Sequence, residues 1–151
     1  MTELALRGEA REVVLAEVQA VRAHASDDEM RARLAELLAA VDGGAVTGES
    51  EELLESVLEL GLQTGRIRAY YGPGGEQAAL GTLRKLPRGR ERGESAAEVS
   101  RALEVLAGST LDSVRINAVA PGAFTLTLEA GGVEATVRLD STGVRLASLG
   151  S

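Results

Sequence analysis

The sequence predicts an α+β fold: a helical N-terminal half with three to four helices, followed by a helix packed on a four-stranded antiparallel β-meander. Up to about Leu106, apolar residues recur every three or four positions, which is the spacing of one helical face. After Gly108, apolar and polar residues alternate instead, which is the pattern of strands with one buried face. This change of period separates a helical part from a sheet.

Two amphipathic helices are expected first. The segment from Leu4 to about Ala25 carries an apolar stripe at Leu6, Ala10, Val13, Val14, Val18 and Val21. Ser26 to Glu29 has the pattern of a capping box, in which the Ser26 hydroxyl accepts a backbone amide, so a second helix should begin there. Gly43 and Gly44 can end that helix. The tight joint between the two predicts an antiparallel hairpin.

Two more helices complete the N-terminal half. A third is expected after Thr47, because three glutamates in its first turn suit the positive end of the helix dipole. It ends at Gly65 or runs on to Tyr71. A short fourth helix, roughly from Gly74 to Leu86, is stopped by Pro87.

A boundary is expected after the fourth helix. Residues 88–94 contain no apolar side chain and two glycines, which is the composition of a linker. We therefore predict a helical domain over residues 1–87, a basic linker over 88–94 and an α-β-β-β-β domain over 95–151. The pattern from Ser95 to Glu98 is a second capping box that should open the helix of the latter domain.

Four strands joined by short turns follow this helix. Turns are expected at Pro121-Gly122, at Gly131-Gly132 and from Asp140 to Gly143. The positions expected on one face are Val114, Ile116, Ala118, Phe124, Leu126, Leu128, Ala135, Val137, Leu139, Val144, Leu146 and Ser148. The sheet should therefore have an apolar and a polar face, and the helix from Ser95 to Ala107 is the nearest candidate to cover the apolar one.

The composition argues against several classes of activity. The 151 residues include no cysteine and one histidine, His24, so thiol chemistry, a zinc–thiolate site and a Ser-His-Asp triad are not expected. We expect no catalytic residue, no metal and no cofactor. Paired-carboxylate chemistry stays open, because separation in space is invisible in a sequence. No leader and no apolar run of membrane-spanning length is seen, so we expect a cytoplasmic protein without a membrane partner.

The glycine-rich stretch from Tyr70 to Gln77 invites comparison with a nucleotide-binding loop. A dinucleotide fingerprint needs a third glycine where Gln77 stands and a buried strand before it. Because Pro73 favours the first turn of a helix, a joint between two helices is the stronger interpretation. A weaker anion site is the alternative, and its residues would be Arg66, Arg68, Tyr70, Tyr71, Gly72, Gly74 and Gly75.

Positive charge gathers in one part of an acidic chain. Between Arg66 and Arg92 stand seven Lys or Arg and two Glu, although the formal net charge is −7. The residues that could contact RNA or DNA are Arg84, Lys85, Arg88, Arg90 and Arg92. A solvated linker is the stronger interpretation of this stretch, and docking to an acidic protein surface is a third. The net charge disfavours a nucleic-acid partner.

The function expected from these observations is non-catalytic protein interaction or assembly. Helical apolar stripes and an exposed sheet edge could pair with a protein partner or with a second copy, as in a homodimer. A small-molecule or anion-binding module, with a phosphate or nucleotide at the turn from Gly72 to Gly75, is the alternative. An RNA-contacting accessory protein that uses the stretch from Arg84 to Arg92 is the third hypothesis.

Overall fold

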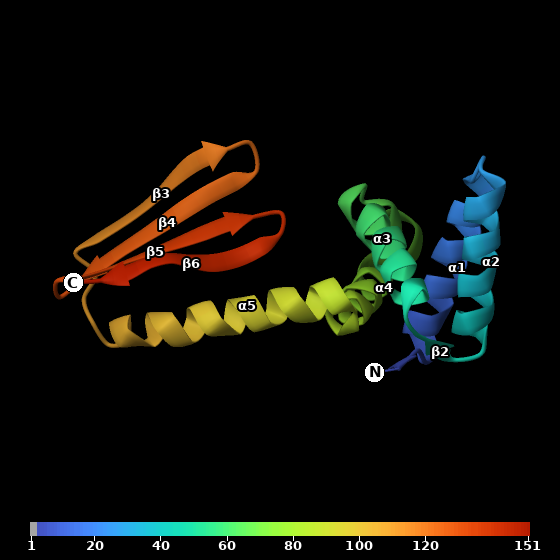
Figure 1. Ribbon diagram of the computed structural model, residues 1–151, viewed down its shortest axis with the longest axis horizontal. Coiled ribbons are helices and arrows are strands. Elements are labelled where there is room, and N and C mark those ends of the chain that lie inside the picture. The colour runs from blue at the N-terminus through green and yellow to red at the C-terminus, as the bar shows by residue number, and fades with distance from the viewer. Residues whose placement is uncertain (1–2) are drawn as a thin grey trace. The chain divides into compact units, whose positions relative to one another are not determined.

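The computed structural model describes residues 3–151 and confirms the α+β fold (Figure 1). Helices α1 to α5 precede a four-stranded antiparallel sheet. The chain divides into two units, of which the first ends at Arg90 and the second runs from Glu91 to Ser151. This division lies inside the segment predicted to be a linker.

The first unit is built on four helices, and a fifth begins in it. Their bounds are α1 Gly8–His24, α2 Asp28–Asp42, α3 Glu49–Gln63, α4 Arg66–Lys85 and α5 Pro87–Leu103. A short strand β1, Leu4–Ala5, pairs antiparallel with β2, Ala45–Val46. The core consists of the predicted helical stripes, with fully buried side chains at Val14, Val18, Leu34, Leu37, Leu54, Leu58 and Ile67. Helices α1 and α2 pack together as the predicted hairpin (Figure 1).

Two helix starts differ from the prediction. Residues Leu4–Ala5 are extended, and the first helix begins only at Gly8. The second helix is capped by Asp27 and not by Ser26, because Oδ1 of Asp27 accepts a hydrogen bond from the Glu29 amide nitrogen at 3.2 Å. A carboxylate is a cap at least as good as a hydroxyl, so the neighbouring acidic residue takes the position.

The joint between two helices at Gly72 is confirmed. Gly65 has a φ of 73° and separates α3 from α4. Within α4, Gly72 leaves the helical conformation, with φ 70° and ψ −175°, and Pro73 opens the second part of the helix. A positive φ is costly for residues other than glycine. These two glycines therefore fix where the helices turn.

The prediction of a helix start at Ser95 was wrong. Helix α5 begins at Pro87, so residues 88–94 are helical and Ser95 lies in the helix interior. The cause is a distant residue: the buried carboxylate of Glu55 on α3 accepts the Gly89 amide at 3.0 Å. This bond satisfies one of the amides that a first helical turn leaves without a partner.

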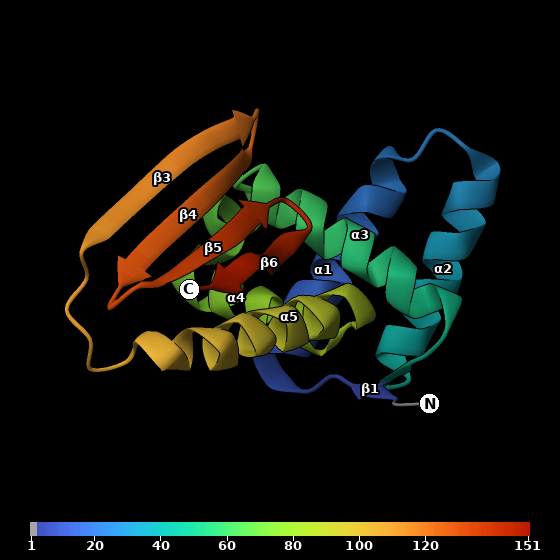
Figure 2. The same cartoon turned by 60° about the vertical axis from the view of Figure 1, so that its left-hand side comes forward.

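The second unit contains the rest of α5, a 3₁₀ turn at Glu104–Leu106 and the meander. The strands are β3 Ser113–Ala120, β4 Ala123–Ala130, β5 Val133–Asp140 and β6 Gly143–Gly150, in that order across the sheet. A small core joins helix to sheet, with Leu103 and Leu106 packed on Leu128, Ala130, Val133 and Ala135. Two views show α5 running beside β6, on the side of the sheet away from β3 (Figures 1 and 2).

Candidate functional site

The register of the four strands places apolar side chains in three rows on one side of the sheet. Each row takes one residue from each strand, and these residues are direct partners across the ladder. Directly paired side chains point to the same face. We call this surface the apolar face; its rows are Val114-Leu128-Ala135-Leu149, Ile116-Leu126-Val137-Leu146 and Ala118-Phe124-Leu139-Val144.

A bulge in β6 determines which residue near the end of that strand lies on the apolar face. The register shifts between Thr136 and Val137, so that Thr136 pairs with Ser148 and Val137 pairs with Leu146. Ala147 is the extra residue of this bulge, and a bulge restarts the alternation of side chains. Ser148 was predicted on the apolar face and lies on the polar one. Leu149 takes its place on the apolar face, opposite Ala135.

The apolar face is covered unevenly. Ala135 and Val137 of β5 are 0% and 3% exposed, close to where Leu106 packs. On β3, by contrast, Val114 is 55% and Ile116 66% exposed, and Phe124 of β4 is 41% exposed. Contiguous exposed apolar surface on a soluble protein marks an interaction site. The open part of the face therefore includes β3 and Phe124 of β4, and Leu149 near the end of β6 is also 43% exposed.

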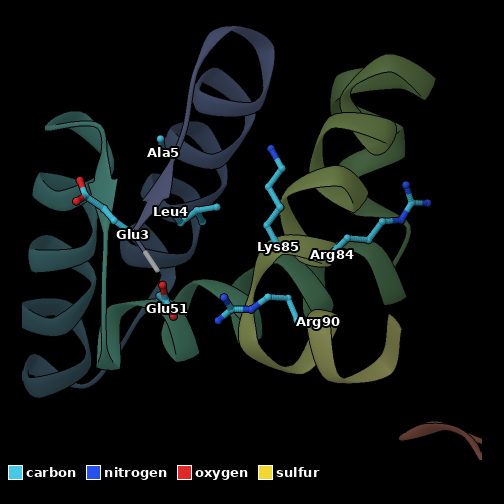
Figure 3. A pocket seen from close by; sticks show the side chains of 7 residues that line it. All are labelled: Glu3, Leu4, Ala5, Glu51, Arg84, Lys85 and Arg90. Carbon is cyan, nitrogen blue, oxygen red and sulfur yellow. The ribbon is translucent and has the colours of Figure 1, made fainter. Parts of the chain in front are cut away.

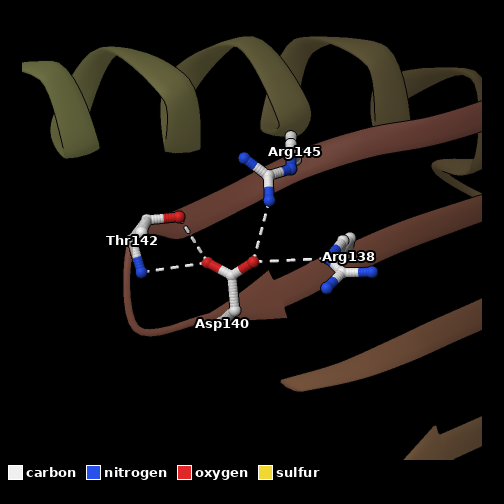
Figure 4. A network of polar contacts seen from close by, with 4 residues as sticks. All are labelled: Arg138, Asp140, Thr142 and Arg145. Carbon is white, nitrogen blue, oxygen red and sulfur yellow. Dashed lines mark hydrogen bonds and ion pairs between the residues drawn. The ribbon is translucent and has the colours of Figure 1, made fainter. Parts of the chain in front are cut away.

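The opposite face of the sheet is polar and locally well ordered. Asp140 accepts hydrogen bonds from the Thr142 amide at 2.9 Å and from the Thr142 hydroxyl (Figure 4). Its other oxygen lies 2.8 Å from Nη2 of Arg145 and 3.3 Å from Nε of Arg138. The bonds from Thr142, more than the two arginines, lower the pKa of Asp140 to about 2. Asp140 therefore holds the β5–β6 turn.

Two residues of the predicted anion site meet a carboxylate of the protein itself. Nε of Arg66 lies 3.0 Å from Oε1 of Glu17, and the Tyr71 hydroxyl donates to the same oxygen at 3.2 Å. Glu17 is 1% exposed. Burial, and after it the Glu17 charge, raises the pKa of Tyr71. The Arg66 guanidinium also lies over the exposed Tyr70 ring, 5.2 Å from its centre.

The remaining residues of the predicted anion site lie around the turn from Gly72 to Gly75. Arg68 pairs with Glu76 at 3.6 Å. A Cβ added at Gly74 would lie 3.1 Å from Oε1 of Glu9, so an acidic side chain stands beside the turn. Gly75 is buried, and a Cβ there would collide with the Cβ of Tyr71. Anion binding at the turn from Gly72 to Gly75 stays a prediction. Both arginines of the predicted site already pair with carboxylates of the protein itself.

The five basic residues of the second predicted set lie in three different environments. The guanidinium of Arg88 contacts three residues of α3. It lies 3.2 Å from the Glu55 carboxylate, 3.4 Å from the Glu59 carboxylate and 3.2 Å from the Ser56 hydroxyl. The stem of Arg92 lies against Gly143. The structure brings Arg84, Lys85 and Arg90 together at a cavity of about 420 Å³, which is also lined by Leu4, Ala5, Glu3 and Glu51 (Figure 3). Contact with RNA stays a prediction.

Sequence reasoning missed the two most deeply buried carboxylates, Glu17 and Glu55. Glu17 lies between Val14 and Val18 in the stripe of α1, and Glu55 lies between Leu54 and Leu58 in the stripe of α3. A glutamate inside an apolar stripe is the signal that could have found them, because a buried charge needs a partner. Their partners, Arg66 and Arg88, are distant in sequence.

The described part of the chain shows neither a metal-binding cluster nor a membrane-spanning helix. Residues 3–151 hold no group of three or more His, Cys, Asp or Glu side chains that could bind a metal ion. Within the same range, every helix is too short or too polar to cross a membrane. Comparison with protein-family models, with curated proteins and with solved structures found no match.

Proposed function

We propose that this chain is a non-catalytic protein-interaction module, and that the apolar face of its sheet is the surface that binds. One observation carries the proposal: Val114, Ile116 and Phe124 lie more than 40% exposed on a face whose three rows are apolar throughout. Monomeric soluble proteins seldom expose contiguous apolar surface of this kind without a use for it.

The energetics favour a partner over solvent. Full burial of a Val, Ile or Phe side chain contributes about 1.5–3 kcal/mol relative to full exposure. Ile116, which is 66% exposed, retains about 1–2 kcal/mol of this stabilisation for a partner. The neighbouring exposed side chains add to it, so a complementary apolar surface would be held there.

The titratable groups with a shifted pKa support a binding role more than an acid–base one. Asp140 is held by its own turn, and Tyr71 donates to the internal carboxylate of Glu17. Both shifts have structural causes within their units. The cysteine-free composition is consistent with a cytoplasmic place of action.

Two substitutions on adjacent residues test the proposal. Ile116→Lys places a charge on the apolar face, whereas Asn117→Lys places the same charge on the polar face of the same exposed strand. Pull-down from the native lysate and sedimentation velocity are run on both variants and on the unchanged chain. We expect Ile116→Lys to lose at least tenfold in complex formation and Asn117→Lys to retain it, with unchanged circular dichroism. Equal binding by both variants would refute the proposal.

A further inference from the structure

We infer that the cavity lined by Leu4, Glu51 and Lys85 is a binding site for a small zwitterion with an apolar body, of the class of the aliphatic α-amino acids. All seven residues that line this cavity belong to the first unit. The inference therefore goes beyond the proposed function, which concerns the second unit, and does not depend on it. Three observations carry it: the apolar wall of the cavity, the buried carboxylate of Glu51 and the positive charge in the same cavity.

The cavity lies between β1 and the joint of α4 with α5 (Figure 3). Its volume is about 420 Å³, near the lower end of the range for small-molecule sites, which is about 300–1,000 Å³. Leu4 and Ala5 give it an apolar wall, and the pairing of Leu4 with Val46 of β2 holds this wall in place. The cavity therefore suits a ligand of amino-acid size, whose aliphatic side chain lies against β1.

Glu51 is a buried residue whose carboxylate lines the cavity without a partner. It is 9% exposed and lies in the first turn of α3, where the helix dipole favours a negative charge. Within residues 3–151 its side chain makes no hydrogen bond and no ion pair. The one fully enclosed side-chain oxygen without a partner in that range is Oε2 of Glu55, so the oxygens of Glu51 keep access to the cavity. A buried charge needs a counter-charge, and the ammonium group of the ligand supplies it.

Positive charge in the same cavity selects a zwitterion over a simple cation. Lys85 at the end of α4 and Arg90 in the first turn of α5 line the cavity together with Glu51. Figure 3 shows these three side chains and Leu4 around one space, whereas Arg84 extends away from it. A simple cation meets Lys85 as a like charge, and a simple anion meets Glu51 as one, which is unfavourable in both cases. A ligand with both charges satisfies Glu51 with its ammonium group and Lys85 with its carboxylate.

Three leucine compounds test the two charges of the ligand on the unchanged chain. L-Leucine carries both charges, L-leucinamide only the ammonium group and N-acetyl-L-leucine only the carboxylate. In isothermal titration calorimetry we expect L-leucine to bind with a Kd between about 10 µM and 1 mM. It should bind at least tenfold more tightly than either derivative, because each derivative leaves one charged group of the cavity unpaired. Equal binding of either derivative, or no binding of L-leucine up to about 10 mM, would overturn the inference.

Matched substitutions then test the residues. Glu51→Gln removes the charge inside the cavity with little change of shape, whereas Glu52→Gln removes the same charge from an exposed neighbour outside it. We expect Glu51→Gln to bind L-leucine at least tenfold more weakly and Glu52→Gln to bind it like the unchanged chain, with unchanged circular dichroism for both. Lys85→Gln should lose the preference for L-leucine over L-leucinamide, and Lys85→Arg should keep it. Equal affinity of the two glutamine variants of α3, or an unchanged preference in Lys85→Gln, would overturn the inference.

Discussion

Nε of Arg88 lies 3.2 Å from Oε2 of Glu55, a carboxylate that is fully buried between α3 and the first turn of α5. In the described part of the chain that oxygen has no hydrogen-bond partner of its own. The contact is therefore an ion pair without good hydrogen-bond alignment. It is the nearby charge that makes burial of the carboxylate tolerable.

Removal of Arg88 should destabilise the first unit. Arg88→Ala leaves the Glu55 carboxylate buried without its counter-charge, and we expect a loss of about 2 kcal/mol, less than for a fully buried pair because the arginine is half exposed. Urea unfolding followed by circular dichroism measures this loss. Arg84→Ala, on the exposed end of α4, is the control and should change stability by less than about 0.5 kcal/mol. An equal effect of the two variants would contradict this account of Glu55.

The contact between Tyr71 and Glu17 should make stability fall at alkaline pH. Burial first, and then the Glu17 charge, raise the pKa of Tyr71 above 10.0. Above pH 10 the unfolded chain loses this proton while the folded chain keeps it, so stability falls as pH rises. The free energy of unfolding, measured between pH 8 and pH 11.5, should fall more steeply with pH for the unchanged chain than for Tyr71→Phe. Tyr70→Phe is the control, and its free energy of unfolding should fall as steeply as that of the unchanged chain.

Asp140 should contribute stability that disappears in acid. Its pKa is lowered from 3.8 to about 2, chiefly by the hydroxyl and amide of Thr142. The contribution is therefore present above about pH 4 and is lost as pH falls through 2. Asp140→Asn should lower the Tm much more at pH 7 than at pH 2. Glu134→Gln, on the same strand, serves as control; a Tm difference for Asp140→Asn that is the same at both pH values would count against this role.

Two glycines of α4 should respond in opposite directions to the same change. A Cβ at Gly75 would collide with the Cβ of Tyr71, whereas a Cβ at Gly81 has no atom within 4 Å. We expect Gly75→Ala to lose about 1–3 kcal/mol through overpacking, and Gly81→Ala to gain about 0.5–1 kcal/mol through helix propensity. Thermal and urea unfolding measure both. Gly75→Ala at or above the stability of the unchanged chain would show that α4 adapts more readily than its packing indicates.

Local pattern accounted for most of the elements. The stripe that includes Val14 and Val18 forms the core of α1, and the alternation through Ile116, Leu126 and Val137 forms the sheet. Gly65 separates α3 from α4, which was one of the two alternatives left open, and Gly72 marks the expected joint. Such features follow from backbone geometry within a few residues, and that geometry is the same wherever the segment lies.

The candidate site was less accessible to sequence reasoning. Alternation places Leu149 on the polar face, and only the bulge at Ala147 returns it to the apolar one. Two residues of the predicted anion site, Arg66 and Tyr71, do converge, but they meet on the carboxylate of Glu17 from a different helix, and anion binding there stays a prediction. A contact between α1 and α4 cannot be read from either segment alone.

The sequence by itself determined most of the helices, the four strands of the meander and the one apolar face of the sheet, because periodicity is a property of each segment. Only the tertiary structure decided that residues 88–94 continue as helix, since Glu55 caps the Gly89 amide from α3. The tertiary structure also decided which part of the apolar face stays open, because Leu103 and Leu106 pack on Leu128, Ala130, Val133 and Ala135 and leave Ile116 exposed. Charge pairing and burial join residues that are distant in the chain, so they are settled only when the segments pack.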